Sequence, residues 1–163
     1  MRTEKPAMAA SKTEINIDAL CIPFPERHLL ERWRRGNVSA INATMAIWED
    51  ARETMTIIGR WKRFIAENSD LIEQATSGRD IERIAAAGKT GVILGFQNTS
   101  PVEHDIELFR VFRGLGVCIM QLTYNLQNFI GAGYWEERDT GISSRFGKKA
   151  IEEMNRVGIL IDL

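Results

Sequence analysis

Two stretches, RGLGVCIMQL at residues 113–122 and NRVGILIDL at residues 155–163, decide the fold because they share one layout. Each contains the end of a predicted helix, a glycine, and then a continuous run of apolar residues. Apolar residues that continue rather than alternate indicate a strand covered on both faces, which is typical of a parallel sheet. Repeated strand–helix units restrict the fold to an open doubly wound sheet or a β/α barrel.

The same alternation of strand and helix extends along the chain. Strands are predicted at residues 15–22, 38–48, 91–97, 117–124 and 158–163. Helices are predicted at residues 25–35, 49–75, 78–90, 98–116 and 145–157. A complete eight-stranded barrel needs roughly 250 residues. The chain therefore has room for about five parallel strands of an α/β fold.

The sharpest helix-start signal lies in the segment NTSPVEHDIEL at residues 98–108. Ser100 can cap a helix, Pro101 suits the first helical turn, and Glu103 completes the pattern of a capping box. Gly116 then provides a stop for the helix. The sequence therefore predicts a capped helix over residues 98–116.

Composition excludes several classes of function. The chain has 163 residues and a formal net charge of −1, which gives no electrostatic basis for binding nucleic acid or an anionic membrane. No run approaches the ~20 apolar residues that span a bilayer. Residues 1–14 lack the apolar middle of a secretory signal and are expected to be a disordered leader before one domain at 15–163. Cys21 and Cys118 are expected to be thiols, which fits a cytoplasmic location, although two cysteines can also pair.

Residues that commonly carry catalysis form no recognisable motif. His28 and His104 lack the spacing of metal-ligand pairs, and the chain shows no nucleophile–histidine arrangement or phosphate loop. Asp18 and Asp162 each lie within an apolar strand, where a carboxylate must be paired, bind a metal or lie at the mouth of the strand. The alternative is an aspartate that bonds neighbouring backbone groups.

Polar residues gather at two of the predicted strand ends. In barrels and doubly wound sheets alike, sites form beyond the carboxyl ends of the parallel strands. Those ends here carry Gln97, Asn98, Thr99, Thr123, Tyr124 and Asn125. The segment that follows, residues 125–144, is too long for a plain connector and is therefore a candidate functional loop.

Several motifs resemble the renal, or membrane, dipeptidase family of zinc metallopeptidases. The resembling pieces are QLTYN (121–125), FGKKAIEEMNRVG (146–158), IDL (161–163) and, upstream, GVILGFQNTSP (91–101). The resemblance implies a partial β/α barrel of the TIM type, a metallo-dependent-hydrolase-like fold, and a parent activity of dipeptide hydrolysis with zinc. Family members continue from IDL to a metal-binding histidine, so the chain is expected to be an N-terminal portion of such a barrel.

This sequence departs from the family pattern where the metal ligands belong. Aligned on Asp18, the chain has Leu20 and Ile22 at the positions of two first-strand ligands, and the shifted alignment places Asn16 there. Gln97 replaces the glutamate that bridges both metals in the family. A neutral amide is a poor substitute for a bridging carboxylate. We therefore expect no catalytic residue, metal ligand or bound zinc in this chain.

The sequence is compatible with three functional hypotheses. The first is the N-terminal portion of a dipeptidase-like enzyme, inactive alone. The second is a non-catalytic module that binds a dipeptide or small peptide through Gln97, Tyr124 and Asn125. Tyr124 stands where relatives carry a substrate-contacting histidine and could still donate a hydrogen bond. The third is an assembly subunit that self-associates through the exposed edge of its fifth predicted strand.

Overall fold

The computed structural model describes residues 14–22, 24–137, 141–142 and 144–163, so the predicted leader lies, but for its last residue, outside the described residues. The described strands form one parallel sheet in the order β1-β2-β4-β5-β6, with β3 paired to β4. The strands are β1 (Ile17–Cys21), β2 (Ala40–Ala46), β3 (Ile72–Gln74), β4 (Thr90–Phe96), β5 (Val117–Gln121) and β6 (Leu160–Asp162). All five predicted strands are therefore present.

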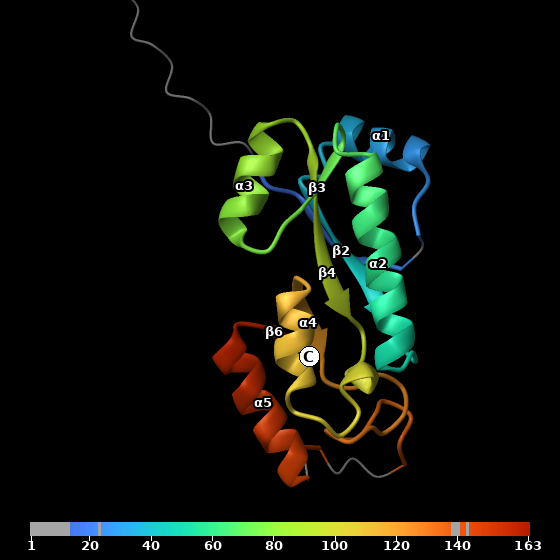
Figure 1. The fold of residues 1–163 in the computed structure, drawn as a ribbon, viewed down its shortest axis with the longest axis vertical. Helices are drawn as coiled ribbons and strands as arrows, with labels where there is room; N and C mark the ends of the chain where they lie inside the picture. Colours follow the sequence, from blue (N-terminus) through green and yellow to red (C-terminus); the bar gives the residue numbers. More distant parts are fainter. Residues whose placement is uncertain (1–13, 23, 138–140, 143) are drawn as a thin grey trace, which may run out of the picture.

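Helices cover both faces of this sheet. They are α1 (Arg27–Arg35), α2 (Ala51–Glu67), α3 (Gly78–Ala86), α4 (Leu108–Gly114) and α5 (Arg145–Val157). The main apolar core joins alternate residues of β2 and β4 to α1, α2, α4 and α5. A smaller cluster joins the opposite face to Ile81 and Ile84 of α3, and Figure 1 shows α2 and α3 on opposite sides of the strands. Burial on both faces explains the continuous apolar runs of β2 and β4, whereas β1 and β6 at the two edges are largely exposed.

The predicted helix over residues 49–75 is wrong in its last third. Helix α2 begins with a capping box between Asp50 and Glu53 and ends at Glu67. The chain then forms β3, a short strand that pairs with Thr90–Val92 of β4. Since β2 occupies one edge of β4 along its length, β3 and β5 share the other edge in succession.

The predicted capping box at Ser100 is also wrong. Residues Ser100–Val102 form one turn of 3-10 helix without a side-chain cap, and Glu103 has a positive φ of 53°. The Ser100 hydroxyl instead donates towards the carbonyls of Ile47 and Glu49, at 3.3 and 3.2 Å. A contact distant in sequence therefore replaces the local cap, and helix α4 begins only at Leu108.

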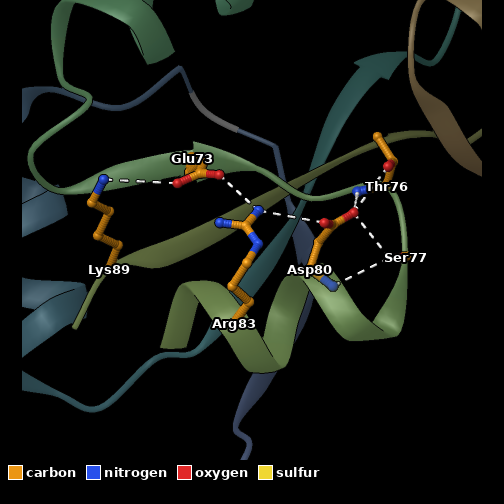
Figure 2. A network of polar contacts seen from close by, with 6 residues as sticks. All are labelled: Glu73, Thr76, Ser77, Asp80, Arg83 and Lys89. Atoms are coloured by element: carbon orange, nitrogen blue, oxygen red, sulfur yellow. Dashed lines mark hydrogen bonds and ion pairs between the residues drawn. The ribbon is translucent and has the colours of Figure 1, made fainter. Parts of the chain in front are cut away.

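A polar network anchors α3 to the sheet near β3. Figure 2 shows its members: Glu73, Thr76, Ser77, Asp80, Arg83 and Lys89. Arg83 pairs with Glu73 at 2.7 Å and with Asp80 at 3.4 Å. The backbone N–H of Thr76, with the hydroxyls of Ser77 and Thr76, lowers the pKa of Asp80 to about 2. The network orders the start of α3 beside β3.

Three smaller sequence predictions can be compared with the structure. Cys21 and Cys118 are thiols rather than a disulfide, as predicted. Asp18 is exposed, and its Oδ1 accepts a hydrogen bond from the backbone N–H of Leu20 at 3.1 Å. This agrees with the alternative interpretation, an aspartate that bonds neighbouring backbone groups. Asp162 is also exposed, at the end of β6. Among the described residues, no helix combines the length and apolarity that crossing a membrane requires.

Candidate functional site

The candidate site is the edge of the sheet where β2, β4 and β5 end. Gln97 follows β4 directly, and its backbone N–H donates to the carbonyl of Ala46 at the end of β2, at 2.9 Å. The next residue, Asn98, donates from Nδ2 to the carbonyl of Ile47 at 2.9 Å. These two bonds hold the connection after β4 against the connection after β2. Polar side chains from separate strands are thereby collected at one edge.

Gln97 presents the clearest unsatisfied group at this edge. Its side chain is 7% exposed, and its Oε1 atom is buried without a hydrogen-bond partner in the described part of the chain. A buried amide oxygen without a donor loses about 1–3 kcal/mol of hydrogen-bonding free energy. Gln97 Oε1 is therefore a buried acceptor that the described residues leave without a donor.

Asn128 joins the long loop to the strand ends. Its Nδ2 lies 2.8 Å from Asn98 Oδ1 and 2.8 Å from the carbonyl of Leu122, and Thr99 Oγ1 lies 3.0 Å away. Its Oδ1 accepts from the backbone N–H groups of Ile130 and Gly131, at 2.7 and 3.2 Å. A single amide thus fixes the ends of β4 and β5 to the turn after residue 128.

Tyr124 and Asn125 are positioned by the same loop. The carbonyls of Tyr124 and Asn125 accept hydrogen bonds from the backbone N–H groups of Tyr134 and Trp135, each at 2.8 Å. The Tyr124 ring packs on the ring of Trp48 with a centroid distance of 5.4 Å. Both predicted residues are half-buried, and Tyr124 forms an aromatic wall that spans the ends of β2 and β5.

Glu49 stabilises the turn after β2. Burial alone would raise the pKa of its carboxyl group, but the backbone N–H groups of Ile47, Glu49 and Trp48 lower it, and the net shift is downward. Its Oε2 accepts from Ile47 at 2.7 Å and from Trp48 at 3.0 Å. The carboxylate is therefore engaged by the backbone and orients the segment that carries Trp48.

The described strand ends do not fit a zinc ion. No group of three or more His, Cys, Asp and Glu side chains lies close enough to hold a metal within the described ranges. Leu20 and Ile22 are exposed apolar side chains at the end of β1, 49% and 52% exposed, and Gln97 offers only an amide oxygen. His104 stacks on Phe146 at a centroid distance of 4.6 Å. The donor set that borderline-soft Zn²⁺ prefers, imidazole, thiolate and carboxylate, is missing from these positions.

The predicted site residues thus lie at the ends of neighbouring strands. Gln97, Tyr124 and Asn125 share one edge of the sheet, although no hydrogen bond joins their side chains in the described structure. Their role in binding substrate stays a prediction. Sequence reasoning missed Trp48 and Asn128, which hold this edge together. The unusual length of the loop 125–144 was the available signal for Asn128.

A curled parallel sheet built from strand–helix units, with polar residues at its carboxyl edge, is typical of the class of β/α-barrel proteins. The family model for Membrane dipeptidase (Peptidase family M19) matches residues 14–163, and the chain belongs to this family. The predicted dipeptidase-like partial barrel is confirmed, and solved members of the family are described as metallopeptidases.

Individual relatives agree with this assignment. The dipeptidase tcpJ of Claviceps purpurea is 28% identical over 114 residues, which are 69% of this chain and 27% of that protein. An amidohydrolase structure from Pseudomonas aeruginosa is 43% identical, with a TM-score of 0.88 over 91% of this chain and 45% of that chain. A metallopeptidase structure from Rhodobacter sphaeroides is liganded with a phosphinate mimic of the dipeptide L-Ala-D-Ala. It is 13% identical, with a TM-score of 0.70 over 82% of this chain and 48% of that chain. The chain therefore spans about a quarter of this curated relative and less than half of these solved structures.

Proposed function

We propose that this chain forms the N-terminal half of a dipeptidase-type barrel and binds a dipeptide or small peptide at its strand ends without hydrolysing it alone. The observation that carries the proposal is the buried, unpartnered Oε1 of Gln97. In this site the amide accepts a hydrogen bond from a peptide N–H or an α-ammonium group, and Tyr124 and Asn125 contact the remainder of the ligand. The peptide-mimic ligand of the Rhodobacter metallopeptidase supports the ligand class.

The proposal also predicts that this chain alone does not hydrolyse dipeptides. Zinc hydrolysis needs an ion and a bound water whose pKa is lowered towards ~7. Leu20, Ile22 and Gln97 leave the strand ends without imidazole, thiolate or carboxylate donors at the positions that the family resemblance assigns to ligands. The described chain therefore has binding groups but lacks a zinc cage. The two thiols further support a cytoplasmic setting as part of this proposal.

Replacing Gln97 with leucine tests the binding site. Calorimetry with L-Ala-D-Ala should show saturable binding to the wild-type chain that weakens about tenfold or more in Gln97→Leu, because a hydrogen bond to a charged group contributes about 1.5–3 kcal/mol. The free energy of unfolding should change by less than about 1 kcal/mol, since the lost oxygen has no protein partner.

Gln127→Leu is the control, because Gln127 is an exposed glutamine on the connection after β5, whereas Gln97 follows β4. It should leave the dissociation constant unchanged. Equal weakening in both variants, or no heat with any dipeptide of a panel, contradicts the binding proposal. Hydrolysis of a dipeptide by the wild-type chain with added zinc, above the rate in buffer, contradicts the proposed inactivity.

A second candidate function is assembly through the edge of the sheet, because β6 pairs only with β5 among the described strands. Leu160 on this strand is 65% exposed, and an unpaired apolar edge favours pairing with another chain. Light scattering should show assemblies of the wild-type chain that Leu160→Lys reduces. Met55→Lys, at a 45% exposed position on α2, should leave them intact. A stable wild-type monomer contradicts this candidate.

A further inference from the structure

A cavity lies beside the end of β2, and the carbonyl of Ala46 on its wall accepts a hydrogen bond from the backbone N–H of Gln97. It has a volume of about 410 Å³, within the range of small-molecule sites. Its walls come from the chain after β1, the end of β2 and one side of α2. Neither Gln97, Tyr124 nor Asn125 lines it. The cavity therefore adjoins the proposed peptide site without sharing these three side chains.

One wall of the cavity is aromatic and apolar. The Phe24 ring lies 5.0 Å from the ring centroids of both Trp61 and Phe64, and Phe24 and Trp61 both line the cavity. Ile57 and Met45 extend this apolar surface. Aromatic and aliphatic side chains in the wall favour a ligand with a planar apolar part.

The rim of the cavity carries two arginines without ion-pair partners. Arg60 and Arg63 are three residues apart on α2, so they lie on one face of the helix. Both are exposed, and no salt bridge to either occurs in the described part of the chain. Arg52 on the same helix also has no ion pair in the described structure, whereas Arg27 pairs with Asp70, Nη2 to Oδ2, at 2.6 Å.

Two acidic residues that line the cavity or an adjoining depression accept hydrogen bonds from backbone N–H groups. Glu49 lines the cavity, but its Oε2 accepts hydrogen bonds from the backbone N–H groups of Ile47 and Trp48. Glu53 lies in an adjoining depression that Arg60 also lines, and its Oε2 accepts from the backbone N–H of Asp50. The two guanidinium groups therefore remain available for an external anion, and their planar geometry suits a carboxylate.

We propose that this cavity binds an organic monocarboxylate with an aromatic body. The carboxylate bonds to Arg60 and Arg63, and the aromatic body packs against Phe24 and Trp61. The site combines an apolar wall with a cationic rim, so it discriminates by charge as well as by shape. It does not depend on the proposed peptide site.

The test compares 2-naphthoate with the neutral 2-naphthylmethanol by isothermal titration calorimetry on the 163-residue chain. Naphthoate should bind roughly tenfold or more tightly than the alcohol, because charge-assisted hydrogen bonds are formed with the carboxylate alone. The double variant Arg60→Gln, Arg63→Gln should remove this preference. Arg52→Gln, on the same helix, is the matched control and should preserve it, and far-UV circular dichroism checks that each variant is folded.

Two further variants separate this site from the peptide site and from adventitious binding. Ile57→Trp fills the cavity and should abolish binding of both probes. Gln97→Leu should leave the binding of naphthoate unchanged. Equal affinities of the two probes for the wild-type chain, or an unchanged preference in the double arginine variant, overturn the proposal. Retention of naphthoate binding in Ile57→Trp overturns it independently of the arginines.

Discussion

Replacing Asn128 with alanine is expected to lower the free energy of unfolding by about 3 kcal/mol. The amide donates towards the oxygens of Asn98 and Leu122 and accepts from two backbone N–H groups of the loop. One of those N–H groups belongs to Ile130, whose side chain is 1% exposed, so water does not readily replace the lost acceptor. The loss of unfolding free energy exceeds that for one typical hydrogen bond, because several partners of Asn128 lose their hydrogen bonds together.

Urea denaturation monitored by circular dichroism measures this change. Asn155→Ala is the matched control, because Asn155 is exposed on α5, and its free energy of unfolding should shift by less than about 0.5 kcal/mol. Asn128→Asp puts a carboxylate oxygen against the Asn98 Oδ1 and the Leu122 carbonyl, so its loss of unfolding free energy should be at least as large as that of Asn128→Ala. A similar small change in Asn128→Ala and Asn155→Ala would show that this amide does not hold the loop.

The parallel sheet was predictable because the amino-acid composition of the central strands indicates that they are buried. The continuous apolar run of β4 is buried at every residue, as a strand covered on both faces should be, whereas the run after Gly158 forms the largely exposed edge strand β6. Gly158 itself has a φ of 76°, the left-handed conformation with which helices commonly end, so the boundary of α5 was readable as well. Local chemistry and tertiary structure agree at these positions.

The missed elements are those in which contacts distant in sequence override local preference. Residues 70–75 continue an apolar spacing compatible with a helix, yet Ile72–Gln74 form a strand because they pair with Thr90–Val92 of β4. Ser100 matches a helix cap in sequence, but its hydroxyl donates towards carbonyls after β2. Neither partner is near in the sequence, so no local pattern could indicate the outcome.

The candidate site was predictable in its location more than in its members. The rule that sites form at the carboxyl ends of parallel strands selected Gln97, Tyr124 and Asn125. It did not select Trp48, which packs on Tyr124, because an aromatic residue at a strand end is also a common core residue. Asn128 was missed because the three groups to which its Nδ2 donates come together only when β4 and β5 are adjacent.

Replacing Gly133 with alanine is expected to disrupt the part of the loop that positions Tyr124 and Asn125. A Cβ atom at residue 133 would lie 2.5 Å from both the carbonyl carbon and the carbonyl oxygen of Asn125, and it would also meet the backbone of Leu126. These are backbone atoms, so the clash is relieved only by moving the loop. The hydrogen bonds from Tyr134 and Trp135 to the carbonyls of Tyr124 and Asn125 would be lost with that movement.

We expect Gly133→Ala to lower the free energy of unfolding by about 3 kcal/mol, from overpacking and two lost backbone hydrogen bonds. Gly59→Ala is the matched control, because a Cβ atom there meets nothing within 4 Å in the interior of α2. That change should stabilise the chain by up to about 1 kcal/mol through helix propensity. Peptide binding at the strand ends should weaken in Gly133→Ala and persist in Gly59→Ala, since only the first displaces Tyr124. If both variants bind L-Ala-D-Ala as the wild-type chain does, Tyr124 and Asn125 do not contact the ligand.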